Sequence, residues 1–111
     1  MGKGLVDSAT EILRLAHLDS ASRLIALAEQ QGRHDALPIA FGQIVRDACH
    51  HRTRKLLVAH NHPSGDPTPS YSDRVATRRL AELLRILDIV LLDHLIFARG
   101  GIASFRAMGL L

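Results

Sequence analysis

Residues 55–73 read KLLVAHNHPSGDPTPSYSD, and three structural signals follow one another within this stretch. Residues 55–59 are a short apolar run, which is typical of a buried strand at the centre of a sheet. Residues 60–71 contain three prolines and a glycine, which predict a loop. From about Ser72 to Leu87 the apolar residues recur at helical spacing and form one stripe, which predicts an amphipathic helix.

The sequence on either side of this stretch predicts four further strands and a second helix. Residues 11–18 and 23–29 have the composition of strands around a polar turn at 19–22, which predicts a hairpin, followed by a loop at 30–35. Apolar residues at helical spacing predict a helix over 38–52, with Pro38 in its first turn. The remaining elements are a strand over 89–98, a turn at 99–101 and a strand over 102–105.

The order of these elements implies an α/β fold of the α+β kind, with a mixed sheet and helices packed on it. One competing signal stands at the first strand, because Ser8-x-x-Glu11 matches a capping box that could start a helix there. The length of 111 residues fits a single domain over 1–111. The hydrophobic share of 47% and the charged share of 23% are those of a globular protein and exclude a disordered chain.

Composition also excludes several classes of protein. No apolar run reaches the ~18 residues that cross a bilayer, and the N-terminus lacks the apolar stretch of a signal peptide, so we expect no membrane partner. The single cysteine, Cys49, excludes an internal disulfide framework and fits a cytoplasmic protein. The net charge is +3 and nearly all basic residues are arginines, which is compatible with a phosphate-bearing partner. The 4% share of aromatic residues argues against recognition of single-stranded nucleic acid by base stacking.

Two of the seven histidines, His60 and His62, stand two residues apart where the predicted central strand ends. In extended backbone such residues point to the same side, so both imidazoles can meet at one point. Asp73 lies in the first turn of the following helix, to which the stiff loop leads back. A catalytic zinc ion usually has three protein ligands, so two histidines and one carboxylate would leave a fourth position open for a water with a pKa near ~7. A structural role at a strand end is the alternative for a His-x-His pair.

Hydrolysis at such a site needs a proton carrier and a group that stabilises the oxyanion. Glu29, at the end of the second predicted strand, is our candidate for the general base, and Glu11 is the only other upstream glutamate and a poorer candidate. Ser70, just before the helix, is the candidate donor to the oxyanion. His94 within its apolar strand is either a buried histidine with a structural partner or an outer partner of a metal ligand.

The whole constellation, His60-x-His62, Ser70 and Asp73 with an upstream glutamate, resembles the JAMM motif of JAB/MPN metalloproteases. The segments 60–70, 92–96, 104–106 and 109–111 are similar to the MPN domain of bacterial RadC-like proteins, and the resemblance runs from about Leu18 to Leu111. It implies a mixed sheet between helices with a cytidine-deaminase-like architecture. It also implies a Zn²⁺ ion held by His60, His62 and Asp73, with Glu29 handling the proton of the water and Ser70 stabilising the oxyanion.

The resemblance therefore implies a zinc-dependent hydrolase of the JAMM type, which cleaves a peptide or isopeptide bond in a peptide or protein substrate. RadC-like proteins have also been labelled DNA-repair factors, so the alternative is a DNA-repair-associated accessory domain with a structural or inactive metal site. The arginine excess is the support that the sequence gives to a nucleic-acid partner. The helix-hairpin-helix module that usually precedes this domain has no counterpart in the 111 residues. The sequence leaves the natural substrate and the oligomeric state open.

Overall fold

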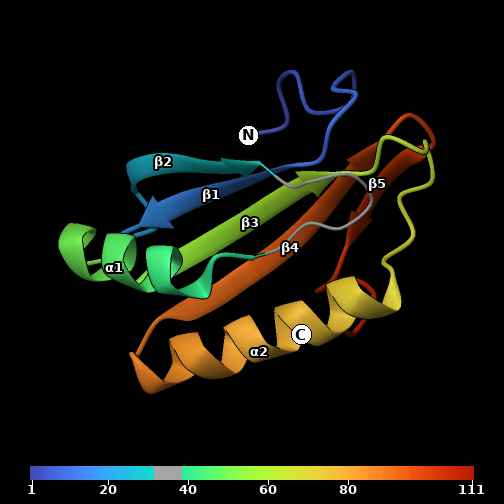
Figure 1. Ribbon diagram of the computed structural model, residues 1–111. Helices are drawn as coiled ribbons and strands as arrows, with labels where there is room; N and C mark the ends of the chain where they lie inside the picture. Colours follow the sequence, from blue (N-terminus) through green and yellow to red (C-terminus); the bar gives the residue numbers. More distant parts are fainter. Residues whose placement is uncertain (32–38) are drawn as a thin grey trace.

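A computed structural model describes residues 1–31 and 39–111, and these residues form five strands and two helices (Figure 1). In chain order they are β1 (Ile12–Leu18), β2 (Leu24–Gln31), α1 (Phe41–His51), β3 (Lys55–Asn61), α2 (Tyr71–Ile86), β4 (Val90–Ala98) and β5 (Gly101–Ser104). The strands make one sheet in the order β2-β1-β3-β4-β5. Strands β3 and β4 are parallel, because α2 crosses over between them, and the other pairs are antiparallel. The predicted α/β fold with a mixed sheet is confirmed.

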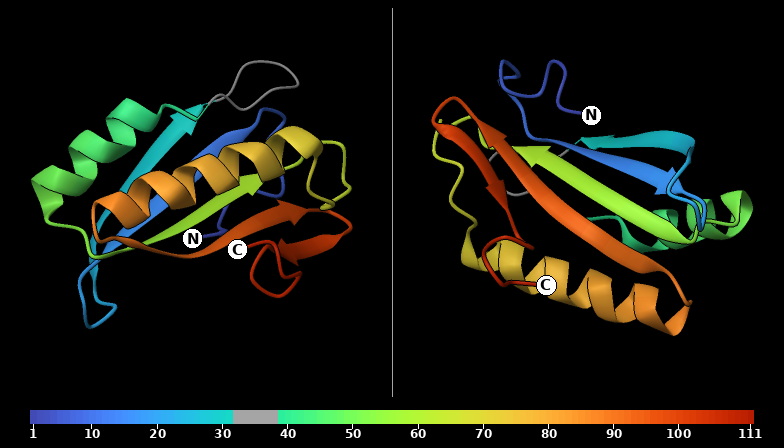
Figure 2. Two further views of the ribbon diagram at one scale, coloured as in Figure 1. Left: turned by 90° about the horizontal axis from the view of Figure 1, so that it is seen from below. Right: turned by 180° about the vertical axis from the view of Figure 1, so that it is seen from behind.

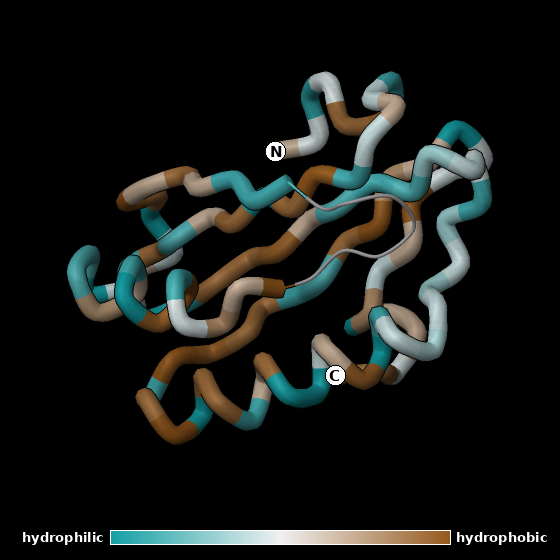
Figure 3. Tube along the Cα trace, viewed as in Figure 1, coloured by the Kyte–Doolittle hydropathy of each residue, from teal (hydrophilic) through white to brown (hydrophobic). Residues whose placement is uncertain are grey.

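Both described helices cover the same face of the sheet (Figure 2). Strands β1 and β3 send every second side chain to this face, as the two-residue period of a strand requires. These side chains pack against apolar residues of both helices, and Figure 3 shows the same hydrophobic character along the central strands. The buried cluster includes Leu13 and Leu15 of β1, Leu56 and Val58 of β3, Ile44 of α1, and Leu80 and Leu84 of α2.

The N-terminal segment lies against the opposite face of the sheet. Leu5 is fully buried, and Gly2 lies directly against the ring of Phe97 in β4. The guanidinium of Arg14 donates to the carbonyl oxygens of Met1 and Lys3, which ties this segment to β1. The helices therefore cover one face of the sheet, and the side chain of Arg14 lies on the other face.

The ends of several elements differ from the prediction. Strand β3 continues through His60 and Asn61, which the prolines had assigned to the loop, because these residues still pair with β4. Gln30 and Gln31 belong to β2 and not to the predicted loop, because they pair with β1. The rest of that loop, residues 32–35, and Pro38 lie outside the described residues.

The alternative of a helix that starts at Ser8 is wrong. Residues 12–18 pair with β2 on one side, and most of them also with β3 on the other, so tertiary pairing outweighs the local capping signal. The side chain of Ser8 hydrogen-bonds to Thr10 instead, within a turn that precedes β1. No helix among the described residues combines the length and the apolar character needed to cross a bilayer.

Candidate metal centre

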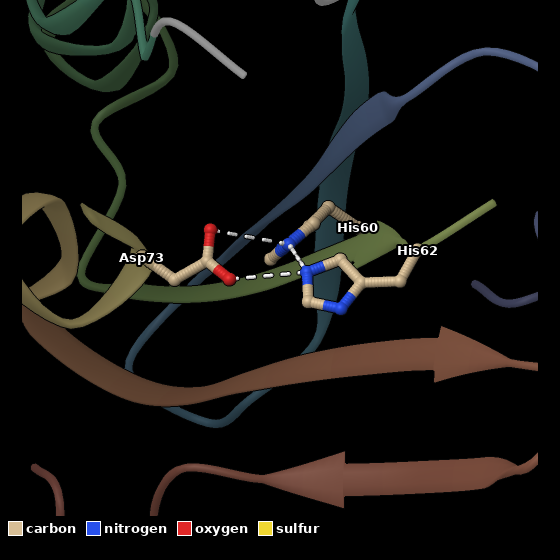
Figure 4. A group of neighbouring side chains, drawn as sticks. All are labelled: His60, His62 and Asp73. Carbon is tan, nitrogen blue, oxygen red and sulfur yellow. Dashed lines mark hydrogen bonds and ion pairs between the residues drawn. The ribbon is translucent and has the colours of Figure 1, made fainter. Parts of the chain in front are cut away.

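The structure brings His60, His62 and Asp73 together at the end of β3 (Figure 4). The Nε2 atoms of the two histidines are 3.1 Å apart. The Asp73 carboxylate lies 3.0 Å from Nε2 of His62 and 3.6 Å from Nε2 of His60. His60 is fully buried, while the side chains of His62 and Asp73 keep 13% and 15% of their surface exposed, so the cluster is reached from one side.

Strand β3 positions the two histidines. His60 follows Leu56 and Val58 on the helix-covered face, since it stands two and four residues further along the strand. Beyond the end of β3, the backbone N–H of His62 donates to the carbonyl oxygen of Phe97 in β4 at 2.9 Å. This bond keeps the chain extended for one more residue, so both imidazoles point to the same side.

The capping of α2 positions the carboxylate. Ser70 is the N-cap of the helix, and its Oγ accepts from the backbone N–H of Asp73 at 3.0 Å. The Asp73 carboxylate accepts in turn from the backbone N–H of Ser70 at 2.9 Å, which completes a capping box. The residue that closes the first turn of α2 is thus the one that reaches the two histidines.

The Asp73 carboxyl is ionised at neutral pH. Partial burial alone would raise its pKa, but the hydrogen bonds from His60 and from the backbone of Ser70 outweigh this effect and hold the pKa well below its usual range. A negative charge beside two imidazole nitrogens is a donor set that suits a divalent transition-metal ion.

Each histidine has its other ring nitrogen occupied. Nδ1 of His62 lies 2.9 Å from the carbonyl oxygen of Asp66, which can only accept, so this nitrogen carries the proton. Nδ1 of His60 lies 2.6 Å from Nε2 of His94. Both Nε2 atoms are therefore left to face Asp73, and the donor set fits a zinc ion with three protein ligands.

The predicted oxyanion donor, Ser70, lies beside this cluster through its bonds with Asp73. Its Oγ accepts one hydrogen bond from the helix backbone, which leaves the hydroxyl proton available for donation. Ser70 is exposed, as a residue that contacts substrate must be.

The structure does not bring Glu29 to the cluster, which corrects the role predicted for it. Glu29 pairs with Arg14 across β1 and β2, whereas Leu13, the next residue in β1, pairs with His60. Since neighbouring residues of a strand point to opposite faces, Glu29 lies on the face away from the histidines. Its carboxylate accepts from Nε of Arg14 at 2.6 Å. A register shift of one residue along β2 would be enough to turn Glu29 to the face that carries the histidines.

The other upstream glutamate, Glu11, lies just before the first residue of β1. Leu13 pairs with His60, and Glu11 directly precedes β1, which places its backbone near the end of β3 that carries the two histidines. The side chain of Asn61 holds this stretch, because its amide accepts from the backbone N–H of Ile12 at 2.7 Å and donates to the carbonyl oxygen of Thr10 at 2.9 Å. Asn61 thus ties both backbone neighbours of Glu11 to the segment between the two histidines.

Comparison with known proteins identifies the family of this domain. The model of the RadC-like JAB domain matches residues 1–110. The chain belongs to the RadC-like JAB domain family.

Curated relatives of this RadC-like domain carry the name UPF0758 protein. The relative from Rhodobacter capsulatus is 42% identical over 103 residues, which are 92% of this chain and 48% of the relative. The relative from Alcanivorax borkumensis is 40% identical over 100 residues, 89% of this chain and 45% of the relative. The chain therefore spans about half the length of these relatives.

Sequence reasoning missed two residues that support the site. Asn61 braces the backbone on either side of Glu11. Thr77 had drawn no attention, although its position four residues after Asp73 places it on the same side of α2. Its hydroxyl lies 2.7 Å from Nδ1 of His94.

Proposed function

We propose that this domain is a zinc-dependent hydrolase of the JAMM type, which cleaves a peptide or isopeptide bond. The observation that carries the proposal is the convergence of two imidazole Nε2 atoms and one ionised carboxylate at a site exposed on one side. A bound zinc ion would supply the Lewis acidity that lowers the pKa of a water towards ~7. His60, His62 and Asp73 would hold the ion.

The chain's own groups supply the remaining chemistry. Glu11 takes the proton of the attacking water and passes it to the leaving nitrogen, a role that is supported by the bonds of Asn61 to both backbone neighbours of Glu11. Ser70 donates its hydroxyl proton to the oxyanion of the tetrahedral intermediate. The Asn61 amide keeps the Glu11 backbone in register with the histidines.

Zinc binding and hydrolysis test this proposal separately. Protein freed of metal and then titrated with zinc should bind about one ion per chain, and His62→Ala should abolish this binding. His50→Ala is the matched control, because His50 is an exposed histidine at the far end of α1. The zinc-loaded protein should cleave members of a panel of peptides and isopeptide-linked conjugates. Failure of the wild-type protein to take up zinc would contradict the proposal.

A DNA-repair-associated accessory role is the second candidate, and one observation favours it. Four arginines of α2 are exposed, namely Arg74, Arg78, Arg79 and Arg85. Exposed guanidinium groups on one helix can contact successive phosphates, in which case DNA affinity falls steeply with salt concentration. Binding of duplex DNA with such a salt dependence, and its loss in Arg78→Gln and Arg79→Gln, would favour this role over hydrolysis.

A further inference from the structure

Behind the candidate metal centre, three buried side chains form a continuous hydrogen-bonded row. Nδ1 of His60 lies 2.6 Å from Nε2 of His94, and Nδ1 of His94 lies 2.7 Å from the hydroxyl oxygen of Thr77. The exposed fractions of these residues are 0%, 1% and 1%. The row connects β3, β4 and α2, so it runs from one ligand-bearing element to the other.

The positions of the protons in this row follow from the groups at its two ends, the Nε2 atom of His60 and the hydroxyl of Thr77. If Nε2 of His60 binds a metal ion, its Nδ1 carries the proton and donates to Nε2 of His94. A neutral His94 that accepts at Nε2 has its own proton at Nδ1, which donates to the hydroxyl oxygen of Thr77. Every polar atom of both imidazoles is then satisfied, with one tautomer for each ring.

The surroundings hold His94 in this orientation. The ring of Phe105 stacks on the His94 imidazole, with centroids 4.6 Å apart and planes inclined by 11°. The carboxylate of Asp93 accepts from the backbone N–H groups of His94 and Arg106 and from the hydroxyl of Ser104. This network fixes the turn that carries Phe105 against β4, so His94 has little freedom to rotate away from His60.

We propose that His94 and Thr77 form a positioning relay that selects the metal-binding tautomer of His60 and holds its Nε2 toward Asp73. This inference rests on the proposed function, because it needs His60 to be a metal ligand. The outer partner of a ligating histidine is commonly a carboxylate or a carbonyl oxygen. Here the partner is a neutral imidazole, which orients His60 without adding negative charge behind the ligand.

Thr77 extends the relay to the helix that carries the third ligand. It lies one turn after Asp73 on α2, so its bond with His94 sets the distance between that helix and β4. A displacement of α2 would therefore move Asp73 and the relay together. His60, His94, Thr77 and Asp73 thus form one unit across β3, β4 and α2.

The protein contains a matched control for this relay. His17 is also a buried histidine, with 1% exposure, and its Nδ1 lies 2.8 Å from the hydroxyl oxygen of Thr53. This pair lies at the opposite end of β1, where Leu18 pairs with Lys55 at the start of β3. Thr53→Val therefore removes the same kind of buried bond as Thr77→Val without touching the metal centre.

The test compares the zinc affinity of four variants with that of the wild-type protein, measured by competition with a chromophoric chelator. We expect Thr77→Val and His94→Phe to weaken zinc binding by about 10- to 100-fold, which is the usual effect of losing an outer partner. His94→Gln should restore part of the affinity, because its amide oxygen can accept from Nδ1 of His60. Thr53→Val should bind zinc as the wild-type protein does.

A second readout follows the tautomer itself. In the zinc-loaded wild-type protein, ¹⁵N–¹H spectra of the imidazoles should show His60 and His94 protonated at Nδ1, and Thr77→Val should alter the His94 signals. Wild-type zinc affinity in Thr77→Val and His94→Phe would overturn the relay and leave the proposed function standing. No zinc uptake by the wild-type protein would overturn the proposed function, and the relay with it.

Discussion

The Glu29 carboxylate lies 2.6 Å from Nε of Arg14, on the face of the sheet that points away from His60. This placement leads us to predict different roles for the two upstream glutamates. We expect Glu29→Gln to leave zinc binding and hydrolysis unchanged and to cost about 0.2–1 kcal/mol of stability, because the pair is partly exposed. We expect Glu11→Gln to keep zinc and to lower kcat by about 10²-fold or more. Inactivity of Glu29→Gln beside an active Glu11→Gln would reverse the assignment.

Substitution of Asp73 by asparagine should weaken zinc binding without a loss of helix content. Asp73→Asn keeps an oxygen that can accept from the backbone N–H of Ser70, so the cap of α2 persists. It removes the charged ligand, and we expect zinc affinity to fall by at least about 100-fold. Circular dichroism should show unchanged helix content while the zinc titration shows the loss. A fall in helix content would mean that the charge itself supports the fold.

Loss of the Ser70 hydroxyl should have a small effect on stability and a large effect on turnover. Ser70→Ala removes the side-chain bond to the N–H of Asp73, at a cost of about 1 kcal/mol. Without the hydroxyl donor we expect kcat to fall by about 10²- to 10³-fold while KM changes little. Thr68→Ala is the control, since Thr68 is an exposed hydroxyl in the same loop that bonds only within it. An equal loss of kcat in both variants would remove Ser70 from the chemistry.

Asn61 should hold the start of β1 in register. Asn61→Leu keeps the size of the side chain and leaves the backbone N–H of Ile12 and the carbonyl of Thr10 without their partner. We expect a loss of about 1–3 kcal/mol in the free energy of unfolding. Hydrogen exchange should show a faster rate at the Ile12 amide and unchanged rates in the middle of β3. Unchanged exchange at Ile12 would show that the amide bonds do not hold this segment.

His94 should make the metal-free protein less stable in mild acid. Burial, and then the neighbouring His60, lower the pKa of His94 to about 3 from an ordinary value of 6.5. The unfolded chain therefore takes up a proton below pH 6.5 that the folded protein refuses, so stability is full above this pH and falls as the pH decreases towards 3. We expect a loss of about 2 kcal/mol between pH 7 and pH 5.

Urea unfolding of His94→Gln at the two pH values checks this slope. The variant should lose less stability than the wild-type protein over the same interval. A residual slope is expected, because burial and the nearby His51 also lower the pKa of His17. Equal slopes in the variant and the wild-type protein would contradict the neutral state of His94 in the folded protein.

The sequence predicted the order of the elements and the three residues that converge, because hydrophobic periods and the loop signals are local. It could not fix which face Glu29 occupies. That depends on the pairing of β2 with β1, and a shift of one residue reverses every side chain. The pairing of His94 with His60 was one of two roles that the sequence left open for His94. It depends on the parallel register of β3 and β4, two strands separated in the chain by α2.

Asp73 accepts a hydrogen bond in the cap of α2 and also lies beside the two histidines, which restricts the residues that can replace it. A histidine there could still ligate zinc, but it would give up the carboxylate that accepts from the Ser70 backbone. An asparagine could still cap the helix, but it would bring no charge to the imidazoles. Under the proposed function, selection for folding and selection for zinc binding act on the same carboxylate. Fewer neutral substitutions are then open to position 73 than to a residue with a single role.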